Sequence, residues 1–195
     1  MSLDLEGVLV PEIWIAVAEK TGIEALRRTT RDEPDYDLLM RGRLDIMREN
    51  DLKLSDIQDV IASLSPLEGA KGFLDELRAQ TQVVILSDTF VQFANPLMRQ
   101  LDWPAIFCNH LEVSDDVVVN YHLRQPDQKR QSVVAFKSLN FEVIAAGDSY
   151  NDTSMLTEAN HGILFRAPEN IQSEFPQFPA VTEFNELMRL IEDRL

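Results

Sequence analysis

The sequence is poor in basic residues and contains a single cysteine. Its 195 residues include 18 Lys and Arg against 33 Asp and Glu, which gives a formal net charge of −15. Phosphate backbones and anionic membranes are held by dense Lys and Arg contacts, so this balance argues against nucleic acid or a membrane surface as the main partner. The lone Cys108 cannot form an internal disulfide, and nothing therefore indicates an oxidising compartment.

Membrane-spanning and secretory patterns are missing as well. No apolar run approaches the roughly 20 residues that cross a bilayer, and the first residues lack the basic and then apolar pattern of a secretory signal. We therefore expect a cytoplasmic protein. Only three residues precede Asp4, which is short for a strand, so the sequence leaves open whether its start is native.

The apolar pattern predicts an α/β fold. Continuous apolar runs at 83–86, 143–146 and 162–165 are typical of buried parallel strands, and stretches with helical spacing separate them. A β-rich region at 106–123, interrupted by a polar turn at 114–116, predicts a short hairpin. Strands that alternate with helices indicate a parallel sheet covered by helices.

A block of helical pattern interrupts this alternation after the first strand. There the apolar side chains recur at helical spacing, and Ser55 with Gln58 is expected to form a capping box at the start of the last helix. We interpret the block as an insertion into one domain. The predicted organisation is a core of residues 1–11 plus 66–195, with a helical cap of residues 12–65.

Oxygen-bearing side chains lie where three predicted strands end. They are Asp4, Ser87 and Asp148. Ligands of parallel sheets bind beyond the carboxyl ends of the strands, so the fold would bring these residues together. Each of them alone is better explained as an ordinary turn or cap residue. All three lie at the end of a predicted strand, and Lys129 lies between Ser87 and Asp148 in the sequence. Together they indicate one site.

These side chains suit phosphoryl chemistry. Asp4 and Asp148 would repel each other unless a cation lay between them, and their hard oxygen atoms favour Mg²⁺. An oxygen of Asp4 can then attack phosphorus, while the Ser87 hydroxyl, the N–H groups after it and Lys129 hold phosphoryl oxygens. Glu6 would lie on the same side of an extended segment as Asp4, where it can exchange protons with the leaving and entering groups. A solvated turn glutamate is the alternative for Glu6.

Four ordered motifs resemble those of a known family. They are Asp4-Leu5-Glu6-Gly7-Val8-Leu9, Ser87-Asp88-Thr89-Phe90, Lys129 and Gly147-Asp148-Ser149-Tyr150-Asn151-Asp152. They resemble the motifs of the haloacid dehalogenase superfamily of phosphohydrolases, and the match, over nearly the whole chain, is most similar to phosphoserine phosphatases. The resemblance implies a Rossmann-like three-layer core with an inserted small helical cap.

The resemblance also implies the roles of the reacting groups. Asp4 would be the phosphorylated nucleophile, and Asp148 would be the second metal carboxylate. Glu6 would be the general acid and base, and its main-chain carbonyl would also reach Mg²⁺. Most relatives carry aspartate at the position of Glu6 and a Gly-Gly pair in the second motif. Glu6 and Ser87-Asp88-Thr89-Phe90 are similar to the branch that also transfers phosphate from phosphoserine to homoserine.

The phosphate-binding roles follow from the same resemblance. Ser87, the backbone N–H of Asp88 and Lys129 would hold the phosphoryl group. Asp152 would orient Lys129, and Asn151 would contact the phosphate or the substrate.

Three cap residues resemble the part of the family that binds an amino acid. Arg43 would bind the substrate carboxylate with its two-pronged guanidinium, and Tyr36 would form an aromatic wall. Glu12 would pair with the substrate ammonium, although its alignment requires a one-residue deletion. Solvated helix charges are the alternative for Arg43 and Glu12. Trp14 is expected to be a packing residue.

We therefore predict a Mg²⁺-dependent enzyme that acts on O-phosphoserine through an aspartyl phosphate. Its phosphoryl acceptor would be water or homoserine, a choice that the sequence does not decide. A phosphatase for another small phosphate ester is one alternative. A non-catalytic phospho-aspartate receiver module is another, although an inserted helical block of roughly 50 residues argues against it. The oligomeric state is left open.

Overall fold

The structure is a computed structural model that describes residues 1–29, 32, 33 and 35–195. Its sheet has seven strands in the order β4-β3-β2-β1-β5-β6-β7. The strands are β1 (Ser2–Leu3), β2 (Val84–Phe90), β3 (Ala105–Ser114), β4 (Val117–His122), β5 (Ile144–Gly147), β6 (His161–Phe165) and β7 (Ala180–Val181). Neighbouring strands are parallel except for the β3–β4 pair. The predicted α/β class and the predicted hairpin are therefore confirmed.

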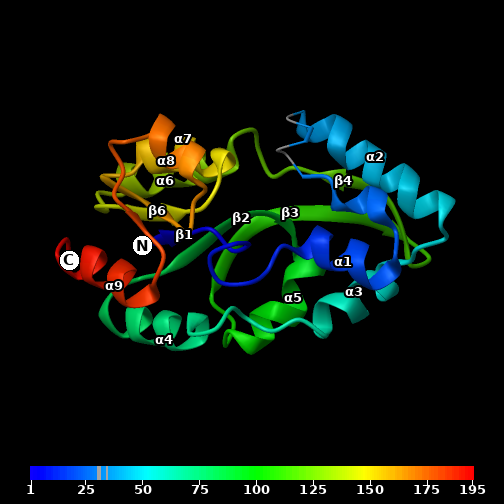
Figure 1. The fold of residues 1–195 in the computed structure, drawn as a ribbon, viewed down its shortest axis with the longest axis horizontal. Helices are drawn as coiled ribbons and strands as arrows, with labels where there is room; N and C mark the ends of the chain where they lie inside the picture. Colours follow the sequence, from blue (N-terminus) through cyan, green and yellow to red (C-terminus); the bar gives the residue numbers. More distant parts are fainter. Residues whose placement is uncertain (30–31, 34) are drawn as a thin grey trace.

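Helices cover both faces of the sheet and make the three expected layers. One face carries α6 (Gln128–Ser138), α7 (Thr153–Glu158) and α8 (Glu169–Glu174), and the other carries α4 (Ala70–Gln80), α5 (Val91–Gln100) and α9 (Phe184–Glu192) (Figure 1). A 3-10 turn, η2 (Tyr150–Asp152), precedes α7. Among the helices of the described residues, none combines the length and the apolarity that crossing a membrane requires.

Strand β1 lies at the centre of the sheet, between β2 and β5. Leu3 is fully buried, and the N–H of Asp4 donates to the carbonyl of Ala146 at 3.0 Å, which continues the pairing with β5. Even two strand residues therefore suffice to place Asp4 at the middle of the carboxyl edge. Strand β2 does not end at Ser87 as predicted but continues to Phe90, with an irregular register after Leu86.

The helical block follows β1, as predicted. It consists of α1 (Ile13–Thr21), the 3-10 turn η1 (Glu24–Arg27), α2 (Tyr36–Glu49) and α3 (Leu54–Ala62). Figure 1 shows these helices at the β3–β4 end of the sheet, with α2 above the hairpin and α1 and α3 below it. The division into a core of 1–11 plus 66–195 and a cap of 12–65 stays a prediction.

The hairpin supplies the N-terminal cap of α3. This helix begins at Leu54, so the predicted capping box of Ser55 and Gln58 is wrong. Asp116, in the β3–β4 turn, accepts hydrogen bonds from the N–H of Leu54 through its carbonyl at 2.8 Å and from the N–H of Ser55 through Oδ1 at 3.0 Å. The Ser55 hydroxyl also donates to Asp116 Oδ2 at 2.5 Å. Donors at a helix start need such acceptors, and here a distant segment provides them.

Candidate active site

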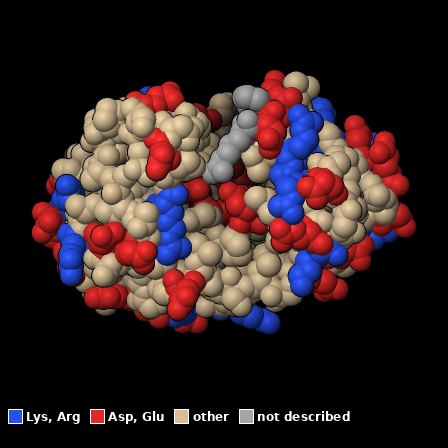
Figure 2. Space-filling model, in the orientation of Figure 1, with Lys and Arg blue, Asp and Glu red and all other residues tan. Residues whose placement is uncertain are grey.

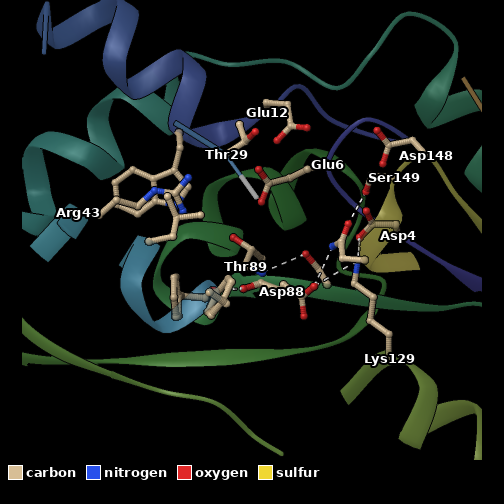
Figure 3. Close-up of a pocket in the computed structure, with 16 residues that line it drawn as sticks. Asp4, Glu6, Glu12, Thr29, Arg43, Asp88, Thr89, Lys129, Asp148 and Ser149 are labelled. Carbon is tan, nitrogen blue, oxygen red and sulfur yellow. Dashed lines mark hydrogen bonds and ion pairs between the residues drawn. The ribbon is translucent and has the colours of Figure 1, made fainter. Parts of the chain in front are cut away.

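The predicted site residues meet in one hollow between the sheet edge and the inserted helices. Figure 2 shows acidic side chains inside this hollow. A cavity of about 100 Å³ lies there, and its lining includes Asp4, Glu6, Glu12, Tyr36, Arg43, Ser87, Asp88, Lys129, Asp148 and Asn151 (Figure 3). The remaining predicted residue, Asp152, lies behind the lining and is fully buried. The topology thus gathers side chains that are far apart in the sequence.

Three buried carboxylates form the acidic centre of the site. Oxygen atoms of Asp4, Asp148 and Asp152 lie within 4.8 Å of one another. Burial raises the pKa of Asp4 well above its usual range, and the charges of Asp152 and Asp148 raise it further, against the lowering effect of Lys129. Clustered carboxylates of this kind are stabilised in their charged form by a cation, and oxygen donors suit Mg²⁺. The donor set therefore fits the predicted metal.

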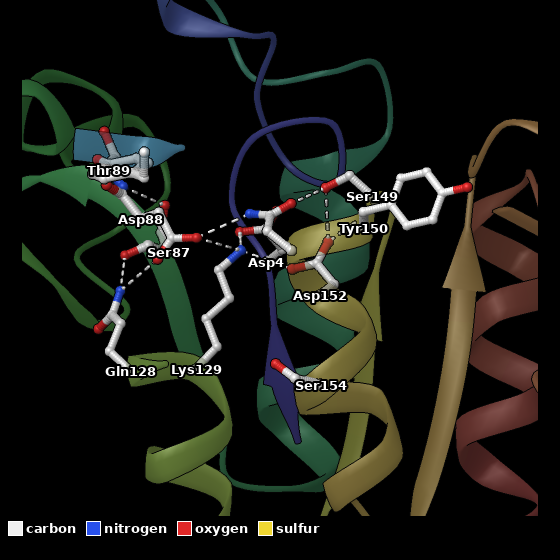
Figure 4. A network of polar contacts seen from close by, with 12 residues as sticks. Asp4, Ser87, Asp88, Thr89, Gln128, Lys129, Ser149, Tyr150, Asp152 and Ser154 are labelled. Carbon is white, nitrogen blue, oxygen red and sulfur yellow. Dashed lines mark hydrogen bonds and ion pairs between the residues drawn. The ribbon is translucent and has the colours of Figure 1, made fainter. Parts of the chain in front are cut away.

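Lys129 places a buried positive charge beside the three carboxylates. Its Nζ lies 2.8 Å from Asp4 Oδ1 and 2.7 Å from Asp152 Oδ1, and the residue is only 2% exposed (Figure 4). Burial opposes the charge on Lys129, but the charges of Asp152, Asp4 and Asp88 outweigh it and raise the pKa of Lys129 well above its usual range. Lys129 is therefore a fixed positive charge beside the Asp4 carboxylate.

Asp152 fixes the loop that carries Asp148. Its Oδ2 accepts hydrogen bonds from the N–H groups of Asp148 at 3.0 Å and Ser149 at 3.1 Å, while its Oδ1 faces Lys129. The contact with Lys129 is the one that the sequence predicts. Both oxygens of Asp152 are engaged in this way, which is compatible with the orienting role that the resemblance implies for it.

Two glycines permit the close approach of these loops. A Cβ on Gly7 would lie 2.5 Å from Asp148 Oδ2, and Gly7 also has a positive φ of 77°. A Cβ on Gly147 would lie 2.4 Å from Asp152 Cγ. Both glycines belong to the quoted motifs, yet no role was predicted for them, since only the folded chain shows which side chain passes each one. They fix the spacing of the acidic centre.

Glu6 lies in a setting that keeps its carboxyl group near half protonation at neutral pH. The N–H of Ile13, at the start of α1, donates to Glu6 Oε2 at 2.9 Å. Burial raises the pKa of Glu6 to about 7, and the charge of Glu12 raises it too, whereas the Ile13 hydrogen bond, Arg43 and Lys129 lower it. A group with this pKa can both give and take a proton at neutral pH.

The segment after Ser87 is held by residues from three other elements. Tyr36 donates its hydroxyl to the Asp88 carbonyl at 3.1 Å, and Asn109 Nδ2 donates to the same oxygen at 3.0 Å. Gln128 Nε2 donates to the Ser87 carbonyl. This hydrogen bond of Tyr36 is a contact that the sequence did not predict, and its role as an aromatic wall stays a prediction. The sequence analysis missed Asn109 and Gln128; the only signal is that Gln128 precedes Lys129.

Arg43 lies at the cap side of the cavity with part of its guanidinium unengaged. Its Nη2 donates to the Arg28 carbonyl at 2.7 Å, and its Cζ lies 4.5 Å above the ring centre of Trp14. Its Nε is buried, and no partner for it exists among the described residues. Burial lowers the pKa of Arg43 to about 10, although Tyr36 and the nearby glutamates oppose this. Trp14, predicted to be a packing residue, also positions the guanidinium.

Known proteins are similar to this chain over nearly its whole length. A relative from Pseudomonas aeruginosa named phosphoserine phosphatase ThrH is 68% identical over 188 residues, which cover 96% of this chain and 92% of that protein. A phosphoserine phosphatase from Pseudomonas syringae pv. tomato is 66% identical, with 96% and 79% covered. A solved substrate-bound phosphoserine phosphatase complex shares the fold, with a TM-score of 0.81 and 20% identity over 97% of this chain and 96% of that one.

The family follows from the sequence itself. The model of haloacid dehalogenase-like hydrolases matches residues 2–160, which contain all four motifs and every predicted site residue. The chain belongs to the haloacid dehalogenase-like hydrolases.

Proposed function

We propose that this chain hydrolyses O-phosphoserine with Mg²⁺ through a phosphorylated Asp4. The observation that carries the proposal is the buried cluster of Asp4, Asp148 and Lys129 at the carboxyl edge, open to a cavity that also contains Arg43 and Glu12. The similarity to phosphoserine phosphatases over 96% of the chain supports the same conclusion.

The Asp4 and Asp148 carboxylates, together with the Glu6 main-chain carbonyl, would hold the metal. When bound, Mg²⁺ neutralises the carboxylates and polarises the phosphoryl group. Lys129 adds a positive charge 2.8 Å from Asp4 Oδ1. This charge matters because a phosphate dianion must otherwise enter a site dominated by carboxylates.

The reaction proceeds in two displacements. An oxygen of Asp4 forms a bond to phosphorus, and the bond from phosphorus to the serine oxygen breaks. Glu6 in its protonated form gives its proton to the departing serine oxygen. Glu6 then takes a proton from water as the water oxygen attacks phosphorus, which releases phosphate and restores the Asp4 carboxylate. Its pKa of about 7 suits both steps.

The cap side of the cavity would select an amino acid ester. Arg43 lines the cavity and would bind the substrate carboxylate there; its buried Nε has no hydrogen-bond partner among the residues that the structure describes. Glu12, which also lines the cavity, would pair with the ammonium group. A guanidinium packed on Trp14 is held in one orientation, which favours bidentate binding.

Homoserine is the second acceptor that we propose. It carries the same carboxylate and ammonium groups as serine, so Arg43 and Glu12 can hold either molecule. Its hydroxyl would take the place of water in the second displacement, and Glu6 would accept its proton. The Ser87 hydroxyl, the backbone N–H of Asp88, Lys129 and Asn151 would hold the phosphoryl group in both reactions.

The test is to incubate the protein with phosphoserine, with and without Mg²⁺, EDTA and homoserine, and to measure phosphate and phosphohomoserine. We expect continuous phosphate release that EDTA stops and Mg²⁺ restores, and no turnover by D4N. A single phosphorylation without turnover would instead support a receiver module. Phosphate release without phosphohomoserine would remove homoserine as an acceptor.

The substrate assignment has its own matched pair of variants. R43A should raise KM for phosphoserine about tenfold or more, because a charged hydrogen-bonded pair is lost. It should leave the slow turnover of phosphoethanolamine, which has no carboxylate, unchanged. R48A removes an exposed arginine from the same helix, where it pairs with Asp45, and should change neither. Equal rates of wild-type protein on both esters would contradict the role given to Arg43.

A further inference from the structure

The Asp88 carboxylate takes no part in the reaction above, yet it contacts groups that the reaction uses. Its Oδ2 accepts a hydrogen bond from Asn151 Nδ2 at 2.9 Å and lies 3.7 Å from Lys129 Nζ. Its Oδ1 lies 3.3 Å from Gln128 Nε2. Figure 4 shows Gln128 and Lys129 directed toward the Asp88 side chain. Three donors from two segments thus hold one anionic group at the edge of the phosphoryl site.

Two of these donors are the ones assigned to phosphate. Lys129 directs hydrogen bonds to Asp4 and Asp152, and Asp88 Oδ2 is the third carboxylate oxygen near its Nζ. Asn151 lines the cavity beside it. A carboxylate offers these donors the same kind of charged oxygen atom that a phosphoryl group offers. Asp88 therefore engages two donors to which the proposed function gives phosphate-binding roles.

Asp88 also has room to move away. Its side chain is 36% exposed, whereas that of Lys129 is 3% exposed. A second cavity of about 490 Å³ adjoins the first, and Asp88, Lys129 and Asn151 line both. The Asp88 side chain stands at the boundary, so it can turn into the second cavity without disturbing the buried ion pairs of Lys129.

We propose that the Asp88 carboxylate is an internal competitor of phosphate, which binds Asn151 and Lys129 in the free enzyme and must be displaced when a phosphate group enters. The proposal rests on the phosphate-binding roles given to those two residues above. The competition lowers the affinity for every phosphate anion, including the free phosphate that remains after turnover. Asp88 thereby keeps the product from blocking the site.

The variant that isolates the charge is D88N. An asparagine side chain has the same shape and can still accept the hydrogen bond from Asn151, but it cannot compete with phosphate as an anion. D127N is the matched control: it removes one acid that lines the second cavity, and the contacts of Asp127 are with Ser154 and Arg130. D88A, which removes the competing oxygens altogether, provides a second test.

Calorimetric titration with inorganic phosphate in the presence of Mg²⁺, and the Ki of phosphate against phosphoserine, measure the effect. We expect D88N and D88A to bind phosphate about tenfold more tightly than the wild type, since a like charge is removed from the anion site. D127N should stay within about twofold. A role of Asp88 in merely supporting Asn151 would instead leave phosphate affinity unchanged in D88N and lower it in D88A.

Different results would refute the competitor role of Asp88 and the proposed function. Wild-type turnover of phosphoserine together with unchanged or weaker phosphate binding in D88N overturns the competitor role alone. A wild-type protein that neither hydrolyses phosphoserine nor binds phosphate overturns the proposed function, and the competitor role with it.

Discussion

Replacing Gly7 by alanine tests how closely the loop after β1 must approach Asp148. The new Cβ would lie 2.5 Å from Asp148 Oδ2 and 2.6 Å from its Cγ. Ordinary contacts begin near 3.4 Å, so Asp148 would have to move by roughly 1 Å, and displacements of that size cost about 10²-fold in rate. The positive φ of 77° adds about 1–2 kcal/mol of backbone strain.

Gly22 provides the matched control for this variant. It has nearly the same positive φ, 71°, but a Cβ there would meet nothing within 4 Å. G22A should therefore lose about 1–2 kcal/mol of unfolding free energy and keep its activity. G7A should lose at least as much stability and, in addition, about 10²-fold in kcat.

Urea unfolding and phosphoserine turnover at saturating Mg²⁺ measure the two effects separately. The informative quantity is the kcat of G7A relative to G22A, since both variants carry the same backbone strain. If G7A retained the activity of G22A, the close contact between Gly7 and Asp148 would not control the geometry of the site.

Three further outcomes follow from the buried groups. K129M should lose about 3–5 kcal/mol of unfolding free energy in urea, because it leaves two buried carboxylates without their cation, whereas R130M, at an exposed neighbour, should lose less than about 1 kcal/mol. In metal-free protein, the raised pKa of Glu6 stabilises the fold fully below about pH 4.5, and this contribution is lost as the pH rises through about 7. The free energy of unfolding of the wild type, measured against pH, should therefore fall by about 3 kcal/mol over this range relative to that of E6Q. Parallel curves for the two proteins would contradict this expectation. Burial raises the pKa of Cys108 to about 11, so the folded protein should not react with a disulfide reagent at pH 8, whereas the unfolded protein should react at once.

Much of the sheet could be predicted because three of its strands contain continuous apolar runs. Parallel strands buried on both faces give continuous apolar runs, and β2, β5 and β6 show them. Helix α5 was missed because Pro96 lies inside it, and proline ordinarily ends a helix. Helix α8 has six residues and β7 has two, which is too short for a periodic pattern.

The position of the site could be predicted because it depends on topology. Asp4 and Asp148 each follow a strand, and Ser87 lies in β2 where its register becomes irregular; a parallel sheet places such positions on one edge. The supporting residues could not be predicted in this way. Asn109 contacts the Asp88 carbonyl, and Trp14 contacts the Arg43 guanidinium. In both pairs the two residues come from different elements, so no local sequence pattern predicts the contact. The catalytic roles stay predictions.

The acceptor that completes α3 has a consequence for the order in which the chain acquires structure during synthesis. Asp116 follows Ser55 by 61 positions, so the ribosome releases the helix segment well before its partner exists. Isolated helices shorter than about 12–15 residues are marginal in water, and α3 has nine residues. We expect this segment to remain largely unstructured on the nascent chain until the hairpin emerges, and to become ordered together with it.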